Sequence, residues 1–279
     1  MTTSMLQFDD AQSRRVEAVY TTPDVVEQRR TVLGLLGPRA GERVLDLGVG
    51  PGFLASEVAA LVGPDGLVAG VDVSESMLAI ARTRVVDGPA APVQLRIGSA
   101  TDLPYEDQSF DAVVSTQVLE YVNDIPAALA EIRRVLRPGG RVLVLDTDWD
   151  SIVWHCHDGA RMERVLTAWQ EHLADPYLPR TLGRQLRDAG FTAAAPRVIP
   201  LLNAGYEQRT YSGGLIPIVA AFVTGRAGLT EVDVAAWVED LQSLGEDYFF
   251  SLNRYVFTAN AGARRSRETS PAAAARSAR

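Results

Sequence analysis

The 279-residue chain contains no lysine, so all 27 of its basic side chains are arginines. The absence of lysine excludes Schiff-base chemistry and the lysine-dependent phosphate binding of P-loop proteins. A single cysteine, Cys156, excludes an internal disulfide. Because reduced cysteine is typical of intracellular proteins, we expect a cytoplasmic location.

Long apolar runs and an excess of positive charge are also missing. No run approaches the ~20 apolar residues of a membrane span, and residues 1–10 lack the basic and apolar segments of a secretory signal. The net charge of −8 disfavours a nucleic-acid-binding surface, which needs clustered positive charge. We therefore expect neither a membrane nor a nucleic acid as partner. The hydrophobic content of 47% is that of a globular enzyme.

A glycine-rich turn is the most informative feature that is present. Residues 44–47 form a short buried strand pattern, and Gly48, Gly50 and Gly52 then lead into a helix expected to begin near Phe53. Glycines let backbone N–H groups approach a ligand, and the N-terminus of the helix carries partial positive charge. A dinucleotide-binding turn has its third glycine where this chain has Phe53, which disfavours an NAD-dependent reductase.

A second strand pattern ends in a carboxylate. Residues 67–72 form a continuous apolar run that ends in Asp72, as expected of a strand buried on both faces. A carboxylate at the carboxyl end of such a strand can accept hydrogen bonds from the two hydroxyls of a ribose. The alternative, a helix N-cap, is less favoured because Ser74 can supply that cap.

The stretch from Asp46 to Gly52, DLGVGPG, resembles motif I of class I S-adenosylmethionine-dependent methyltransferases. Three later stretches agree with that family: residues 98–105 (GSATDLPY), 109–115 (SFDAVVS) and 136–140 (LRPGG). The resemblance implies a doubly wound, seven-stranded α/β sheet and transfer of a methyl group from S-adenosylmethionine, with S-adenosylhomocysteine as product. Methyltransferases of nucleic-acid bases carry [DNS]-P-P-[YFW] where this chain reads STQV, so base methylation is disfavoured.

The resemblance also implies which residues bind the donor. Asp46 would orient its methionine end, Asp72 its ribose, and Met77 would pack on adenine, with a core methionine as the alternative. Ser99 stands where the family has an aspartate for adenine, so recognition would use this neutral hydroxyl, the Ala100 N–H or Asp102. The predicted donor-binding set, including a cap residue and a residue below the sulfonium, is Tyr20, Asp46, Gly48, Gly50, Gly52, Asp72, Met77, Ser99, Ala100 and Thr116.

Four segments are expected along the chain. Residues 1–40 would form an N-terminal helical cap over the donor, and residues 41–148 the donor-binding core. Residues 149–260 would complete the sheet with two antiparallel strands, at residues 191–202 and 248–258. They would also add insertions over the acceptor, with helices near residues 211–223 and 231–244. Residues 261–279, with five arginines, would be a disordered tail, for which a nucleic-acid-binding arm is the alternative.

Catalytic candidates follow the fifth strand, where the fold places residues over the donor methyl group. We predict Asp148 and His155, with His155 as general base for a hydroxyl acceptor because an imidazole titrates near neutral pH. A histidine packed beside Trp154 is the alternative, and His172 is expected in a helix that packs elsewhere. His155 and His157 lack a suitably spaced third ligand, so no metal is predicted.

The predicted function is methyl transfer to an O, N or C atom of a small-molecule acceptor, a secondary metabolite of aromatic or indolic type. A macromolecule-directed methyltransferase and a donor-binding protein without catalysis are the alternatives. The sequence leaves the acceptor and the oligomeric state open.

Overall fold

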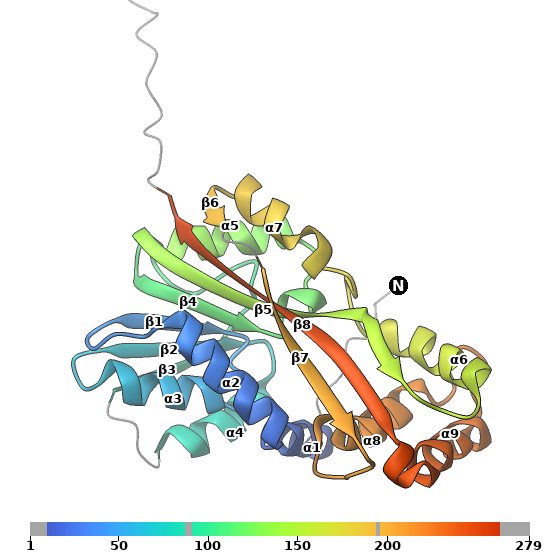
Figure 1. Ribbon diagram of the computed structural model, residues 1–279. Helices are drawn as coiled ribbons and strands as arrows, with labels where there is room; N and C mark the ends of the chain where they lie inside the picture. Colours follow the sequence, from blue (N-terminus) through green and yellow to red (C-terminus); the bar gives the residue numbers. More distant parts are fainter. Residues whose placement is uncertain (1–9, 87–90, 194–195, 263–279) are drawn as a thin grey trace, which may run out of the picture.

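The structure, a computed structural model, describes residues 10–86, 91–193 and 196–262. Over these residues the chain forms one sheet of eight strands with helices packed on both faces (Figure 1). The doubly wound α/β fold predicted from the sequence is thus confirmed. The predicted tail, residues 261–279, lies almost entirely outside the described residues.

The strands are β1 (Arg43–Leu47), β2 (Leu67–Asp72), β3 (Val93–Ile97), β4 (Phe110–Thr116), β5 (Leu136–Trp154), β6 (Phe191–Ala193), β7 (Arg197–Ala204) and β8 (Phe249–Ala261). The helices are α1 (Asp10–Tyr20), α2 (Pro23–Leu36), α3 (Phe53–Val62), α4 (Glu75–Val86), α5 (Ile125–Val135), α6 (Gly159–Gln170), α7 (Pro179–Asp188), α8 (Tyr211–Val223) and α9 (Glu231–Ser243), with short 3₁₀ turns η1 (Leu119–Tyr121) and η2 (Gly245–Asp247).

The strand order is β3-β2-β1-β4-β5-β8-β6, and β7 also pairs with β8. Strands β1 to β5 are parallel, whereas β8 runs antiparallel to β5, β6 and β7. The order therefore reverses between β1 and β4. Ligands of open α/β sheets bind at such a switch point, outside the carboxyl ends of the strands.

The sheet has eight strands where seven were predicted, because the expected strand at residues 191–202 is divided. Its first part, β6, pairs with residues 259–261 of β8, and its second part, β7, pairs with residues 249–256. Pro196 stands between the two parts and has no N–H with which to continue a ladder of hydrogen bonds.

Strand β5 is 19 residues long and continues to Trp154, through residues that were predicted to belong to the cap insertion. It pairs with β8 from Arg141 to Asp148, and after an irregularity it pairs again at Val153 and Trp154. The pairing with β8 therefore extends β5 beyond the edge of the parallel sheet.

Helices cover the two faces of the sheet with separate hydrophobic cores. Helices α5 and α7 pack on one face, and α2, α3 and α4 pack on the other (Figure 1). The α2–α3 face carries Val32, Val58 and Leu78, whereas the opposite face carries Leu129 and Leu182.

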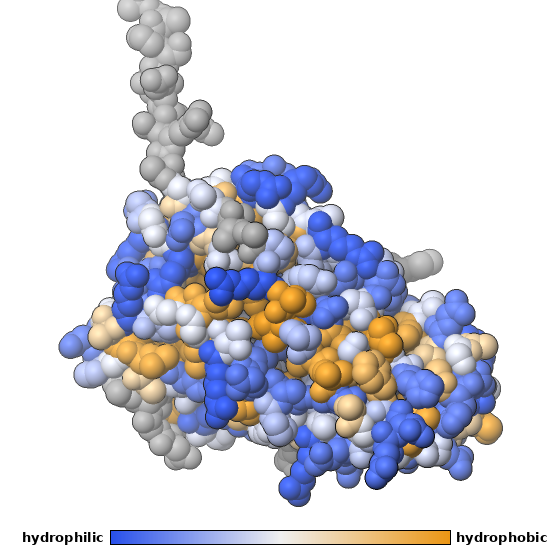
Figure 2. Space-filling view, viewed as in Figure 1, coloured by the Kyte–Doolittle hydropathy of each residue, from blue (hydrophilic) through white to orange (hydrophobic). Residues whose placement is uncertain are grey.

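A third core forms the predicted cap at the far end of β5 and β8. It unites α6, α8 and α9 with the beginning of α2 and includes Trp154, Val165, Leu215 and Trp237. Figure 1 shows these helices gathered around that end, and Figure 2 shows hydrophobic residues across the middle of the same face. Within the described residues, no helix is long and apolar enough to cross a membrane.

Candidate functional site

A cavity of about 510 Å³ lies at the carboxyl edge of the parallel strands, within the range of small-molecule sites. One end is formed by the strand ends and the glycine turn, and the other by the cap. Of the predicted donor-binding residues, those that line it are Tyr20, Asp46, Gly48, Gly50, Asp72, Met77, Ser99, Ala100 and Thr116.

Each glycine of the turn has a left-handed backbone, with φ of +71°, +50° and +82° at Gly48, Gly50 and Gly52. A Cβ on Gly48 would overlap the side chain of Val118, whereas a Cβ on Gly50 would meet nothing closer than 4.0 Å. Gly50 therefore faces open space in the cavity. Gly52 does not line the cavity, and its Cα packs against Ala81 of α4, 3.0 Å from where a Cβ would lie.

The carboxylate of Asp72 is held at the mouth of the turn. Its Oδ2 accepts the N–H of Gly50 and its Oδ1 accepts the N–H of Ser74, both at 2.9 Å. The hydroxyl of Ser74 accepts the N–H of Met77 at 3.3 Å, so Ser74 supplies the predicted cap. Burial raises the pKa of Asp72. The carboxylate is thus preoriented towards the space that a ribose would occupy.

Asp46 carries an unsatisfied buried oxygen into the same region. The residue is 2% exposed, and its Oδ2 has no hydrogen-bond partner. Burial and the charge of Asp72 raise the pKa of Asp46 to about 8. A buried carboxylate oxygen without a partner is costly. The ammonium group of a methionine moiety would satisfy it, so the residues present fit the donor implied by the sequence.

The segment after β3 forms the part of the cavity wall beside β2, where the Gly98 N–H donates to the Asp72 carbonyl at 3.0 Å. The hydroxyl of Ser99 lies 2.9 Å from that of Thr101 and also accepts the Thr101 N–H at 3.2 Å. Ser99 is therefore engaged by its own loop. Ala100 and Thr101 line the cavity beside it, whereas Asp102 does not. Met77 lines the cavity and is 4% exposed, so it serves the core as well.

Tyr20 ends α1 and covers the glycine turn. Its carbonyl accepts from Nη1 of Arg29 at 2.6 Å, and its ring stacks on Phe53 with centroids 6.4 Å apart. Burial raises the pKa of Tyr20 to about 12, so the phenol is neutral. Thr21 and Thr22 separate the two N-terminal helices α1 and α2.

Aromatic side chains form the cap end of the cavity. The rings of Trp149 and Trp169 meet edge to face at 5.8 Å, and Tyr211, Leu215 and Ile218 complete an apolar wall. One cation, Arg254 from β8, lies in this wall. Such a surface suits a planar, apolar ligand.

Two buried acids hydrogen-bond to the backbone just after β4 and within β5. Neither of them was predicted from the sequence. Asp146 accepts the N–H of Val118 at 3.0 Å, and Glu120 accepts the N–H of Thr147 at 2.9 Å. Burial raises the pKa of Glu120 to about 7, and burial together with the Glu120 charge raises the pKa of Asp146 well above its usual value. Their hydrogen bonds fix the segment that follows Thr116. The one available signal was an acid inside an otherwise apolar run.

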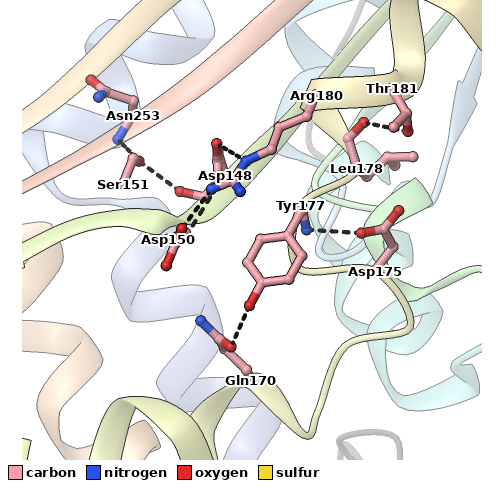
Figure 3. Close-up of polar contacts among 10 residues, drawn as sticks. All are labelled: Asp148, Asp150, Ser151, Gln170, Asp175, Tyr177, Leu178, Arg180, Thr181 and Asn253. Carbon is pink, nitrogen blue, oxygen red and sulfur yellow. Dashed lines mark hydrogen bonds and ion pairs between the residues drawn. The ribbon is translucent and has the colours of Figure 1, made fainter. Parts of the chain in front are cut away.

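Asp148, a predicted catalytic residue, lies outside the cavity wall. Both of its oxygens accept from Arg180 at 2.9 Å, and Arg180 also pairs with Asp150 at 2.8 Å (Figure 3). This ion pair joins β5 to the first turn of α7. The carboxylate of Asp148 therefore forms a structural ion pair and does not line the cavity in which a methyl acceptor would bind.

The histidines are arranged differently from the prediction. His155 lies beyond the extended end of β5, where its N–H pairs with the Phe249 carbonyl, and it does not line the cavity. His157 lies 2.6 Å from Asp240. His172 was expected in a helix packed elsewhere, but its ring contacts Trp149 and Trp169 directly behind the wall. Burial lowers its pKa to about 4, so it is neutral. Among the described residues, no group of three or more His, Cys, Asp or Glu could hold a metal.

The doubly wound sheet, the glycine turn and the two carboxylates at its carboxyl edge define an α/β enzyme that binds a nucleoside-type donor. Comparison with known proteins identifies the family. Residues 45–144 match the family described as a methyltransferase domain. The chain is 42% identical over 201 residues to the ubiquinone/menaquinone biosynthesis C-methyltransferase UbiE of Pseudomonas fluorescens, over 69% of this chain and 75% of that protein. It belongs to the class I S-adenosylmethionine-dependent methyltransferases, and S-adenosylmethionine is its donor.

Two further relatives are similar to much of the chain. A demethylmenaquinone methyltransferase of Symbiobacterium thermophilum is 45% identical over 196 residues, which cover 61% of this chain and 78% of that protein. An uncharacterized 37.1 kDa protein in transposon TN4556 of Streptomyces fradiae is 36% identical over 225 residues. The chain spans 63% of the length of that protein and 46% of a UbiE of Pseudomonas putida.

Solved structures show the same fold. Phosphoethanolamine N-methyltransferase 2 of Haemonchus contortus, in complex with S-adenosyl-L-methionine, has a TM-score of 0.59 at 23% identity, over 92% of this chain and 58% of that chain. The [4+2]-cyclase SpnF has a TM-score of 0.54 at 26% identity, over 85% of this chain and 81% of that chain.

Proposed function

We propose that this methyltransferase acts on a small molecule with an aromatic ring system, which binds at the cap end of the cavity. The observation that carries the proposal is that the donor-type residues and the aromatic wall of Trp149, Trp169 and Tyr211 line one continuous cavity. A ring held against that wall would lie beside the donor. The net charge of −8 also favours a small molecule over a nucleic acid.

In the donor half, each residue has a role that its surroundings support. Asp72 accepts the ribose hydroxyls, Asp46 accepts the ammonium group, and the Gly50 backbone permits close approach. Met77 and Ala100 lie beside the adenine, and Tyr20 covers the donor. Thr116, at the end of β4, lies nearest the transferring group. The bound donor supplies an electrophilic methyl group.

Methyl transfer of this kind needs alignment and exclusion of water more than acid–base chemistry. No histidine is among the described residues that line the cavity, and the nearest imidazole, His172, is neutral and packed behind the wall. An electron-rich ring carbon, which needs no strong base, is therefore the acceptor atom that we favour. Two relatives are named as a C-methyltransferase and a demethylmenaquinone methyltransferase, which agrees with this choice.

The proposal is tested by incubating the protein with methyl-labelled S-adenosylmethionine and a panel of hydroquinones, naphthols, indoles and aliphatic amines. We expect the mass of at least one aromatic compound to increase by one methyl group, with the new bond on carbon. Transfer confined to aliphatic amines, or to added RNA or protein, would contradict an aromatic acceptor.

A further inference from the structure

Arg254 interrupts an apolar face of β8. Along this face Phe250 and Leu252 pack into the cap core, and Val256 packs into the core beneath α2 and α3. Between them stands a guanidinium that is only 4% exposed and lines the cavity. A hydrophobic side chain would be the expected residue at such a position.

The charge of Arg254 is oriented but not neutralised. Its Nη1 donates to Oε1 of Gln28, its guanidinium lies 4.6 Å from the centre of the Tyr211 ring, and its Nε has no hydrogen-bond partner. Arg180 makes a useful contrast, because two carboxylates bind it directly (Figure 3). No ion pair within 4.0 Å is found for Arg254 among the described residues.

Among the described residues, Glu120 is the acid found to interact with the charge of Arg254, and it is a poor counter-ion. The charge of Asp24 acts on Tyr211, but its Oδ2 already accepts the Tyr211 N–H and Nδ2 of Asn203. One of the oxygens of Glu120 already accepts the Thr147 N–H, and its negative charge disfavours ionisation of the neighbouring Asp146 carboxyl. Burial raises the pKa of Glu120 to about 7, so only part of the population is ionised at neutral pH. Arg254 is therefore left with excess positive charge in an apolar wall.

Buried cations are retained in proteins when an anion or a dense set of hydrogen bonds compensates them. Gln28 and Tyr211 hold the guanidinium in place without supplying that charge. The missing anion must then come from a ligand in the cavity. Because Trp149 and Leu215 line the same wall, the rest of that ligand would be apolar.

We propose that Arg254 binds an anionic oxygen of the acceptor, a carboxylate or an ionised phenol attached to its aromatic ring. This assignment rests on the proposed function and adds the charge of the acceptor to it. The contact would anchor one edge of the ring and so select which ring atom faces the donor methyl. Arg254 is thus an acceptor-binding residue that sets specificity.

The test measures binding by calorimetry to protein saturated with S-adenosylhomocysteine at pH 7.5. One arm compares 2-naphthoate with its neutral isostere 2-naphthamide, and the other compares 1-naphthol with 1-methoxynaphthalene. For a charge-assisted contact we expect at least about tenfold tighter binding of the partner that can carry an anionic oxygen, 2-naphthoate or 1-naphthol, in one arm. Which arm shows it tells whether the anion is a carboxylate or a phenolate.

Arg254→Met should abolish that preference, and Arg254→Lys should restore part of it, while both variants keep the affinity for S-adenosylhomocysteine within about threefold. That retained affinity also shows that the variants are folded. Equal binding of the charged and neutral partners in both arms, or no binding of any of the four, would overturn the proposal.

A large loss of S-adenosylhomocysteine affinity in both variants would also overturn the proposal, because it would show that Arg254 binds the carboxylate of the donor. The proposed function is judged separately by methyl transfer to the panel. Methylation of neutral aromatics with no anion preference keeps the function and rejects the role of Arg254. An anion preference without any methyl transfer keeps the role of Arg254 and rejects the proposed function.

Discussion

The backbone N–H of Gly50 donates a 2.9 Å hydrogen bond to Oδ2 of Asp72. This bond joins the turn after β1 to the end of β2, and the Ser74 N–H holds the second oxygen of the same carboxylate. Since both donors are backbone N–H groups, each oxygen of Asp72 keeps a further lone pair that is available to a ligand. The two sequence motifs that predicted the donor site are therefore one hydrogen-bonded unit.

Replacement of Asp72 by alanine should weaken binding of S-adenosylmethionine by roughly 2–4 kcal/mol, because two charge-assisted bonds to the ribose are lost. Asp72→Asn is the matched control: it keeps an acceptor for Gly50 and should retain part of the affinity. Calorimetry on folded variants measures both. An unchanged affinity in Asp72→Ala would remove this residue from the donor site.

Gly48→Ala should destabilise the protein by about 1–3 kcal/mol, because the new methyl group would overlap Val118 and the backbone is left-handed. The free energy of unfolding in urea reports the effect. In the double variant with Val118→Ala, space is restored and we expect part of the loss to be recovered. If the two changes are simply additive, the contact between Gly48 and Val118 is not what excludes a side chain.

Asp46 should make stability depend on pH in the direction opposite to that of a salt-bridged acid. Its pKa in the folded protein is about 8, against 3.8 for the ordinary group, so the folded state holds a proton that the unfolded state releases. Its contribution to stability is present below about pH 4 and is lost as the pH rises towards 8. Asp46→Asn should lessen this decline by up to about 1.4 kcal/mol per pH unit, measured by urea unfolding between pH 5 and 8. An identical slope in both proteins would mean that Asp46 is ionised in the folded state.

The same carboxyl should release a proton when the donor binds near pH 7, because an ammonium group favours its ionised form. Calorimetry in two buffers of different ionisation enthalpy measures the number of protons released. We expect a substantial fraction of one proton in the wild type and much less in Asp46→Asn. Equal release by both proteins would assign the proton to another group.

His155→Ala should reduce turnover by less than about threefold, since His155 lies outside the cavity wall. A general base would instead account for roughly 10²–10⁴-fold. The labelled-donor assay that defines the acceptor measures this rate between pH 6 and 9. A loss of a hundredfold, together with an altered pH profile, would return His155 to the active site.

The sequence predicts those parts of the molecule that depend on local signals. Helix α8 begins and ends at the expected residues because Thr210 caps its first turn, and the glycine turn lies where its spacing indicates. Asp148 and His155 lie outside the cavity wall because β5 continues past the parallel sheet, and its length depends on its pairing with β8, about a hundred residues later in the chain. No local sequence pattern near Trp149 predicts that pairing.

Arg254 was missed for a different reason. A single arginine in a strand near the end of the chain resembles a solvent-facing residue, and only the cores on either side of it show that its face is buried. Its position in the alternation of Phe250, Leu252 and Val256 was the available signal. A charge in phase with buried residues indicates a functional group, whereas a charge out of phase indicates the surface.

The position of β8 also has a consequence for how the protein is made. This strand pairs with β5, β6 and β7, and it is the last of the described strands to leave the ribosome. Until then the 19 residues of β5 present an unpaired edge, which is prone to join other nascent chains. Pairing over so long a sequence separation is slow. A ribosome stall between Asn203 and Phe249 should therefore yield a chain that depends on chaperones, whereas release after Ala261 should yield one that no longer does.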